Sequence, residues 1–280
     1  MRKAAHQARS IKVTADGPVP TQRCVPEEVP VALVYDGSTH AVMMASPTDL
    51  EAFALGFSLS ERIVVDPNEI QNMEVIDQGG GIELRMWLSP GRSRALAERR
   101  RSLAGPTGCG LCGIESLEAA VQACPRVTSE LTVSAKDIQS ALATLIPAQR
   151  LNQQTHAVHG AGYWTRTDGL VALTEDVGRH NALDKLIGKL RKADISVGEG
   201  IVLLTSRVSV EMVQKAAIAN VPVVVAISAP TALALKTAEE AGITLIAVAR
   251  SDGFEVFTHP HRVAGLDTVQ AKKSAIEYAA

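Results

Sequence analysis

Three short apolar runs in the second half of the chain constrain its fold more than any other feature. They occupy residues 201–204, 221–227 and 243–248. Helical patterns separate them, one starting near Val210 and one over Thr231–Glu240. Strands that alternate with helices in this way form a parallel sheet whose faces are covered by helices. We therefore expect an α/β fold in the second half of the chain.

The first half has a different pattern, rich in strands. Apolar runs flank Asp36-Gly37-Ser38, and others flank Gly79-Gly80-Gly81, which predicts two β-hairpins. Ser46 is followed by a proline and then by apolar residues at helical spacing. This predicts a helix whose cap is the serine hydroxyl.

We expect an α+β protein with two domains. A smaller β-rich N-terminal domain would span residues 1–133 and end with the cysteine segment described below and its helix. An α/β domain would span residues 134–280, and its first element would be a helix over residues 134–146.

Composition excludes two classes of nucleic-acid-binding protein. Aromatic residues make up 3% of the 280 residues, too few for a surface that stacks single-stranded bases. The net charge of −2 excludes a globally basic binder of polyanions. Residues 1–10 lack the apolar core of a secretory signal, and prolines interrupt the uncharged stretch 216–235. We expect a cytoplasmic protein with neither a nucleic-acid nor a membrane partner.

The segment 105–113 places two cysteines, Cys109 and Cys112, among four glycines. Four cysteines in the whole chain are too few for a disulfide scaffold, so this pair is expected to be chemical or metal-binding. A helix expected from Glu115 would favour a thiolate at its N-terminal end. Because glycines would let that thiol reach two partners in turn, the segment favours a persulfide carrier.

Other interpretations of the cysteine pair stay open. A structural zinc site needs four ligands and the chain has no second CxxC pair, although Cys124 and His156 or His159 would be available. A thioredoxin-like redox pair follows a strand in a βαβ unit, whereas this pair belongs to the strand-rich half. Two buried, inert cysteines would leave the glycines unexplained.

Several motifs carry a family resemblance over nearly the whole chain. They are Glu27-Glu28-Val-Pro, DLEAFALGF at 49–57, TGCGLCG at 107–113, EDVGRHNALDK at 175–185, SAPT at 228–231 and FTHP at 257–260. With these motifs the chain resembles the formate dehydrogenase accessory sulfurtransferases, the FdhD/NarQ family. The cysteine segment and the 175–185 stretch are the most specific of the motifs.

The resemblance implies a sulfur carrier, or sulfurtransferase. Such a protein takes sulfur from a cysteine desulfurase as a cysteine persulfide and passes it to the molybdenum bis-(molybdopterin guanine dinucleotide) cofactor of formate dehydrogenase. Cys109 matches the persulfide-bearing cysteine and Cys112 a second one. The resemblance also implies a homodimer, and a three-layer α/β second domain similar in fold to cytidine deaminases but without a catalytic metal.

The resemblance further implies cofactor-binding residues. Those of the C-terminal segment are Phe257, Thr258, His259, Pro260, His261 and Arg262. His159 also keeps the family's position. The family usually shows TGGxHAAA around that histidine, whereas residues 155–162 read THAVHGAG here, so His156 and Ala157 replace two glycines.

The expected parallel sheet indicates a ligand site as well. In open α/β sheets ligands bind beyond the carboxyl ends of the strands, and polar residues follow these ends here. They include Ser206, Arg207, Ser228, Thr231 and Arg250. Helix N-termini and the two arginines would hold phosphates.

Four further residues open a helix next to this expected site. They are Glu175, Asp176, Arg179 and His180. Their carboxylates would accept the N1 and N2 hydrogens of a guanine nucleotide. Each of these residues, taken alone, could instead be a helix cap or a surface charge with no role in ligand binding.

Missing motifs narrow the function further. Neither a GxGxxG fingerprint nor a GxxxxGK[ST] loop occurs, which argues against a nicotinamide dehydrogenase or an ATPase. A basic run precedes the cysteines, consisting of Arg92, Arg94, Arg99, Arg100 and Arg101. It is a solvated helix face or a docking site for an acidic partner or cofactor phosphates. A molybdenum cofactor chaperone without sulfur chemistry and a zinc-knuckle binding protein are the alternative functions.

Overall fold

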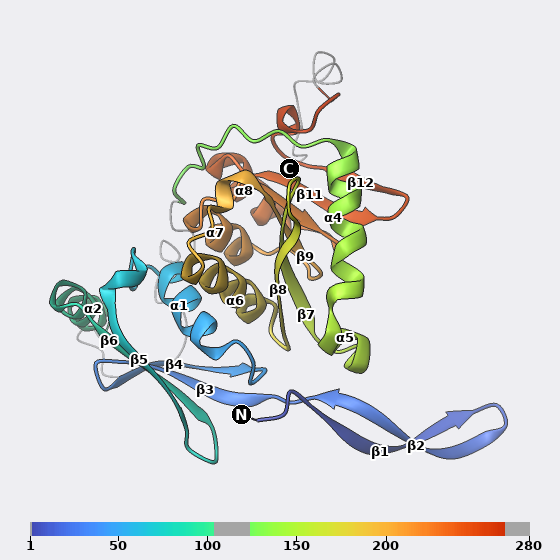
Figure 1. The fold of residues 1–280 in the computed structure, drawn as a ribbon, viewed down its shortest axis with the longest axis horizontal. Coiled ribbons are helices and arrows are strands. Elements are labelled where there is room, and N and C mark those ends of the chain that lie inside the picture. Colours follow the sequence, from blue (N-terminus) through green and yellow to red (C-terminus); the bar gives the residue numbers. More distant parts are fainter. Residues whose placement is uncertain (1, 104–123, 267–280) are drawn as a thin grey trace.

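A computed structural model describes residues 2–103 and 124–266 of the chain. In these parts the strands form three sheets, with two, four and six strands, and helices cover the largest sheet (Figure 1). The predicted mixed α/β class is confirmed.

The four-stranded sheet belongs to the N-terminal part and has the order β4-β3-β6-β5. Its strands are β3 (Val29–Tyr35), β4 (Ser38–Ala45), β5 (Ile70–Asp77) and β6 (Ile82–Leu88). Both predicted hairpins are present as antiparallel pairs, and β3 and β6 join them as a parallel pair. Val31 and Leu33 point inward and share a core with Phe53 of helix α1 (Leu50–Ser60). Helix α2 (Pro90–Leu103) follows β6.

A long hairpin precedes this sheet and was not predicted. Its strands are β1 (Ala5–Thr14) and β2 (Gly17–Pro26), and we call it the arm. Figure 1 shows the arm leading away from the rest of the molecule. The turn signal was present in the sequence as Asp16-Gly17, and Gly17 has the positive φ of 115° that glycine tolerates.

The six-stranded sheet has the order β12-β11-β10-β9-β7-β8. Its strands are β7 (His159–Thr165), β8 (Gly169–Asp176), β9 (Ile201–Leu204), β10 (Val223–Ala226), β11 (Thr244–Arg250) and β12 (Gly253–Val256). The three predicted strands, β9 to β11, are parallel as expected. The other three run antiparallel to their neighbours. Short 3-10 turns cover Pro67–Glu69, Val197–Glu199 and Pro260–Arg262.

Side chains of the parallel strands alternate between two helix layers, as the period of a strand requires. Ile201 and Leu203 pack on the side of α4, whereas Val202 and Leu204 pack on the other side. The first layer contains α4 (Ala135–Ala148) and α5 (Arg150–Thr155). The second contains α6 (Arg179–Lys192), α7 (Val210–Ile218) and α8 (Ala232–Ala241). The C-terminal part is therefore a three-layer α/β structure, and α4, α7 and α8 begin close to the expected residues. Helix α6 begins at Arg179, so Glu175 and Asp176 end β8 and do not open the helix as predicted.

The two larger sheets share one apolar core across the predicted domain boundary. Helix α1 of the first part lies against α6 of the second, and the crossing is made by two glycines. A Cβ atom on Gly56 would lie 1.7 Å from the carbonyl oxygen of Asp184, and one on Gly188 would lie 1.9 Å from that of Ala52. All strands of the four-stranded sheet precede residue 133, and all strands of the six-stranded sheet follow residue 134. The domain boundary itself stays a prediction.

Candidate functional site

The two cysteines expected to carry sulfur, Cys109 and Cys112, lie outside the described residues, as does the cysteine segment around them. The described chain resumes at Cys124, which lines a cavity of about 510 Å³ together with Leu59 of α1 and Ile187 of α6. Burial raises the pKa of the Cys124 thiol above its ordinary value. At neutral pH this thiol is therefore a weaker nucleophile than an exposed one.

The carboxyl edge of the six-stranded sheet brings most of the predicted nucleotide-site residues together. Because β7 runs antiparallel to β9, its first residue lies where β9 ends, and the Gly160 N–H donates to Thr205 Oγ1 at 2.8 Å. Strand β8 ends at the same edge, since His159 pairs with Asp176. The residues that meet there are His159, Glu175, Asp176, Arg179, His180, Ser206, Arg207, Ser228 and Thr231. We call this region the carboxyl edge.

Three helices of the second layer begin at the carboxyl edge. Thr231 caps α8, because its Oγ1 accepts the N–H of Ala234 at 3.2 Å. The cap residues of α6 and α7, Gly178 and Ser209, make no such side-chain bond. The first N–H groups of a helix lack partners within the helix and carry partial positive charge. The start of α6 is therefore open to an anionic ligand, whereas the first turn of α7 already holds the carboxylate of Glu211.

Three buried polar atoms near this edge lack hydrogen-bond partners among the described residues. They are Nε of Arg179, in the first turn of α6, Oγ of Ser209, directly before α7, and Oε1 of Gln149, which lies close to Gly160. Leaving such an atom unsatisfied costs about 1–3 kcal/mol. A donor and an acceptor of this kind are suited to bind a polar ligand.

Arg207 and Arg250 differ in whether their guanidinium groups are free to bind a ligand at this edge. Arg207 is exposed. The guanidinium of Arg250 donates through Nη1 to the carbonyls of Ile227 and Ala249, so it already holds the ends of β10 and β11 together. Arg207 and Arg179 are thus better placed than Arg250 to bind phosphate oxygens.

The two histidines of the carboxyl edge are uncharged at neutral pH. Burial lowers the pKa of His180 to about 4, and the positive charges of Arg179 and Lys215 act in the same direction. Burial and Arg179 also lower the pKa of His159, although Asp176 opposes them. Positive charge at this edge therefore comes from the arginines and the start of α6.

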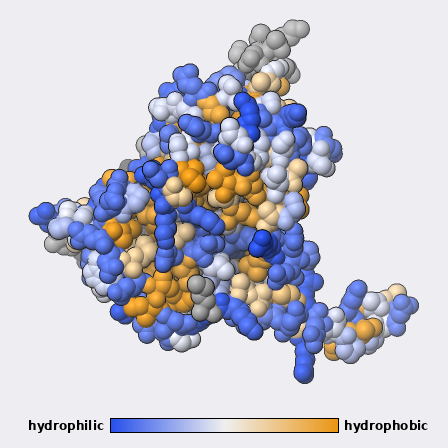
Figure 2. All heavy atoms as spheres, viewed as in Figure 1, coloured by the Kyte–Doolittle hydropathy of each residue, from blue (hydrophilic) through white to orange (hydrophobic). Residues whose placement is uncertain are grey.

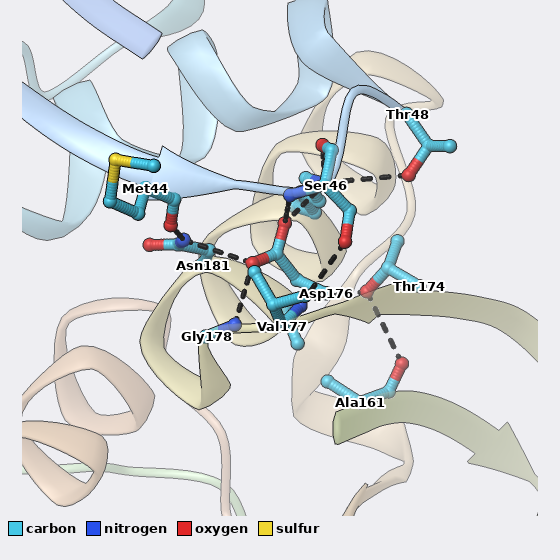
Figure 3. A network of polar contacts seen from close by, with 11 residues as sticks. Met44, Ser46, Thr48, Ala161, Thr174, Asp176, Val177, Gly178 and Asn181 are labelled. Atoms are coloured by element: carbon cyan, nitrogen blue, oxygen red, sulfur yellow. Dashed lines mark hydrogen bonds and ion pairs between the residues drawn. The ribbon is translucent and has the colours of Figure 1, made fainter. Parts of the chain in front are cut away.

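Asp176 does not fit its expected role as an acceptor for guanine, because it is completely buried. Its Oδ2 accepts the Lys185 ammonium at 2.6 Å and the Ser46 N–H at 2.9 Å. Its Oδ1 accepts the Gly178 N–H at 2.7 Å and the Asn181 amide at 3.0 Å (Figure 3). Both oxygens are thus engaged in joining the loop before α1 to the start of α6.

Glu175 does not fit the same role either. Its carboxylate accepts the N–H groups of Leu151 at 2.9 Å and Asn152 at 2.8 Å, which are the first turn of α5. Glu175 therefore caps the N-terminus of α5, which directly follows α4. A helix cap was the alternative role that the sequence analysis gave for this residue. Oε1 of Gln149 is an acceptor at this edge that has no hydrogen-bond partner among the described residues, and sequence reasoning missed it.

Ser46 is not the helix cap that the sequence predicted. Helix α1 begins at Leu50 with Asp49 before it, and Asp49 makes no side-chain cap bond. Ser46 is instead fully buried, and its Oγ accepts the N–H of Val177 at 3.2 Å. The turn after Pro47 places the serine against the second sheet.

A second buried ion pair lies further along α6 and was also missed. Asp184 accepts the Lys215 ammonium of α7 at 2.9 Å and the Ser60 hydroxyl of α1 at 2.7 Å. The Lys215 ammonium also reaches Glu61 at 3.2 Å. The signal was the adjacent Asp184-Lys185 pair inside an otherwise apolar helical pattern, because buried charges need partners.

The predicted cofactor-binding tail lies at the opposite edge of the sheet. Thr258 and Arg262 are buried and structural: Thr258 donates to the carbonyl of Ile243 at 2.6 Å, and Arg262 Nη1 donates to that of Gly242 at 2.8 Å. Strand β12 ends beside the start of β11, which places the tail away from the carboxyl edge. Arg262 therefore does not fit a phosphate-binding role.

The remaining residues of the tail are more accessible. Phe257, His259 and Pro260 are partly buried and His261 is exposed. The rings of His259 and His261 meet edge to face with centroids 5.5 Å apart. A ligand contact of the tail would involve these side chains rather than Thr258 or Arg262.

No group of three metal-ligating side chains occurs in residues 2–103 and 124–266. Since Cys109 and Cys112 lie outside these ranges, the zinc alternative stays a prediction. None of the helices in the same ranges is long and apolar enough to cross a membrane.

The sequence is similar to named proteins over most of its length. Residues 26–264 match the FdhD/NarQ family. The sulfur carrier protein FdhD of Agrobacterium fabrum is 56% identical over 247 residues, which cover 88% of this chain and 91% of that protein. The sulfur carrier protein FdhD of Cupriavidus necator is 49% identical over 240 residues, 85% of this chain and 83% of that protein.

A solved structure resembles the fold. It is a crystal structure described as a formate dehydrogenase accessory protein from Desulfotalea psychrophila, 24% identical to this chain. The alignment has a TM-score of 0.73 and covers 93% of this chain and all of that one. From its sequence motifs and its relatives, the chain belongs to the FdhD/NarQ family.

Proposed function

We propose that this protein is a sulfur carrier that supplies sulfur to the molybdenum cofactor of a formate dehydrogenase. The observation that carries the proposal is the 56% identity to a sulfur carrier protein FdhD, in a chain with two cysteines in a glycine-rich segment. The sulfur donor would be a cysteine desulfurase. The client cofactor would be the molybdenum bis-(molybdopterin guanine dinucleotide) form.

The chemical step we propose is a thiol–persulfide exchange at Cys109. The thiolate of Cys109 attacks the outer sulfur of a persulfide on the desulfurase, a new S–S bond forms, and the donor cysteine leaves as a thiolate. The sulfur then stays on Cys109 until the client cofactor is reached. Cys112 assists or resolves this intermediate.

The carboxyl edge is the proposed binding region for the nucleotide part of the client cofactor. Arg179 and Arg207 would bind phosphate oxygens together with the uncapped start of α6. The buried Nε of Arg179, which has no hydrogen-bond partner among the described residues, supports this assignment. His259 and His261 of the tail would contact another part of the same large molecule at the opposite edge.

Mass spectrometry after incubation with a cysteine desulfurase and cysteine tests sulfur transfer. One added sulfur on Cys109 is expected in the wild type and none in Cys109→Ala, which should keep its fold. Cys112→Ala should still accept sulfur. A chaperone without sulfur chemistry would gain no sulfur in the wild type, and equal total loss in both variants would contradict the assigned roles.

Calorimetric titration with guanosine diphosphate tests the carboxyl edge. Arg179→Ala and Arg207→Ala should each weaken binding about tenfold, since a charge-assisted hydrogen bond contributes roughly 1.5–3 kcal/mol. Arg126→Ala is the matched control, because this exposed arginine lies near Gly242 at the opposite edge. Unchanged binding in both edge variants would remove the carboxyl edge from the proposal.

A further inference from the structure

Helices α1, α6 and α7 surround the cavity of about 510 Å³ that Cys124 lines. Its apolar lining comes from all three helices and includes Leu59 of α1, Ile187 of α6 and Ile218 of α7. We call this space the interhelix cavity. Ligand sites are commonly cavities of this size, lined by apolar side chains with a few polar groups and placed between two parts of a chain. The interhelix cavity therefore has the form of a binding site.

The charged side chains that line the interhelix cavity are basic. They are Arg62, Arg191 and Lys215, and no carboxylate of the described residues lines the cavity. The Lys215 ammonium is already balanced, since it pairs with Asp184 at 2.9 Å and with Glu61 at 3.2 Å. The remaining positive charge comes from Arg62 and Arg191, which are both exposed. An anionic group would therefore be attracted to the mouth of the cavity.

Arg191 has no structural role that would explain its charge. Its guanidinium makes no hydrogen bond or ion pair with any other residue that the structure describes. A basic side chain can cap the carbonyl groups at a helix C-terminus, but these groups are already bonded here. The carbonyls in the last turn of α6 accept the N–H groups of Ala193, Asp194 and Ile195. Arg191 is thus free to bind a ligand at the cavity.

The described chain stops and resumes beside the interhelix cavity, on either side of the cysteine segment. Arg99, near the end of α2, donates to the Glu61 carbonyl at 2.8 Å, next to Arg62 of the cavity lining. The described chain resumes at Cys124, which also lines the cavity. Cys109 follows the end of α2 by six residues, and six residues span at most about 20 Å. A protein that delivers sulfur to Cys109 must therefore approach this part of the molecule.

The interhelix cavity is separate from the carboxyl edge. Arg179 opens α6 at that edge, and Arg191 lies about 18 Å further along the helix axis, at 1.5 Å per residue. Helices α1 and α6 lie side by side (Figure 1). Figure 2 shows apolar and hydrophilic side chains mixed on the surface over these helices. A partner at the cavity would therefore make contacts other than those of the nucleotide.

We propose that the interhelix cavity is the docking site of the sulfur donor, which inserts a segment with a carboxylate next to an apolar side chain. The inference rests on the proposed function, because only a sulfur carrier needs such a donor. Arg62 and Arg191 bind the carboxylate, and the apolar lining surrounds the neighbouring side chain. Charge at the rim then selects the partner and speeds its approach.

Two surface variants of the full chain test the docking site. Biolayer interferometry measures their affinity for the cysteine desulfurase that loads sulfur onto the wild type. Arg191→Glu should weaken binding at least about tenfold, because it sets a carboxylate against the donor's own. Val65→Asp should have a similar effect, since Val65 lines the cavity and is 62% exposed. Circular dichroism should show the wild-type fold in both variants.

Two further variants are matched controls for charge and for exposure. Lys136→Glu makes the same change of charge at an exposed residue of α4, on the other side of the six-stranded sheet. Val42→Asp replaces a valine of similar exposure, 58%, on β4 of the four-stranded sheet. Both controls should bind the desulfurase as the wild type does. Only the cavity variants should lose affinity.

The dependence on salt provides a second measurement. Wild-type affinity for the desulfurase should fall as the salt concentration rises from about 0.05 to about 0.3 M, and Arg191→Glu should flatten this dependence. Equal affinity of the wild type and both cavity variants would overturn the docking site and leave the sulfur carrier function standing. An equal loss in the control variants would overturn it too, because the effect would then be one of overall charge. A wild type that accepts no sulfur from a desulfurase would overturn both proposals.

Discussion

At the scale of single residues, the buried pair of Asp176 and Lys185 is the feature whose removal should cost most. Lys185 is fully buried, so Lys185→Met would leave the Asp176 carboxylate in the core without its cation. Removing one partner of a buried ion pair destabilises a protein by about 3–5 kcal/mol. Urea denaturation should show a loss of this size.

Lys192 provides the control for that substitution. It lies on the same helix and pairs with Glu51, but both side chains are more than half exposed. Exposed ion pairs contribute only about 0–1 kcal/mol. If Lys192→Met and Lys185→Met lowered the free energy of unfolding equally, the buried pair would not have the role that its geometry indicates.

His180 should make the protein less stable as the pH falls from about 6.5 to about 4. Its pKa is about 4 in the folded protein, because burial disfavours the charged ring, and its ordinary value is 6.5. Between these values the unfolded chain binds the proton and the folded chain does not, so protonation favours unfolding. His180→Gln should flatten this part of the curve of unfolding free energy against pH. An unchanged slope would contradict the assignment.

The residue scale is also where sequence reasoning failed most clearly. Polar residues at strand ends predicted the carboxyl edge correctly, because strand direction alone brings them there. The hydrogen-bond partners of each carboxylate could not be predicted. Asp176, for example, accepts the N–H of Ser46, which lies far away in the sequence. Arg262 failed for the same reason, because its acceptors are carbonyls of distant loops.

At the scale of elements, the crossing of α1 and α6 depends on its two glycines. Gly56→Ala should lower the free energy of unfolding by about 3 kcal/mol, the upper end of the usual cost of overpacking, because its Cβ would meet backbone rather than a movable side chain. Gly91→Ala is the control: Gly91 is also in a helix but has open space around it. That variant should be unchanged or more stable by at most about 1 kcal/mol. Thermal melts of both variants check the prediction, and a tolerated Gly56→Ala would refute the close crossing.

Elements with strong local patterns were predicted and others were not. The parallel strands and α7 and α8 follow from apolar runs alternating with helices, and α4 follows from an apolar stripe behind Ser134, whose hydroxyl accepts the Asp137 N–H at 3.1 Å. The arm has few buried side chains, so it lacked the pattern of a half-buried strand. Its strands join through Ala15 and Asp16, since Thr14 pairs with Gly17.

At the scale of the whole molecule, the shared core predicts that neither part folds well alone. Helix α6 is buried on nearly every side, against its own sheet and against α1. A fragment of residues 134–280 would expose the face of α6 that α1 covers, including Gly188 and Ile187. Expressed separately, it should unfold with low cooperativity or bind a hydrophobic dye, in contrast to the full chain. A sharp, cooperative transition in the fragment would contradict this.

The contact between Gly56 and Gly188 also sets an order of events during synthesis. Residues that lie this far apart in the chain leave the ribosome on the order of ten seconds apart at ordinary translation rates. The apolar face of α1 therefore stays uncovered until α6 has been synthesised. Cys109 and Cys112 leave the ribosome during that interval. The nascent chain thus presents these two cysteines before its core can close, which makes this the period when chaperones and cellular reductants matter most to it.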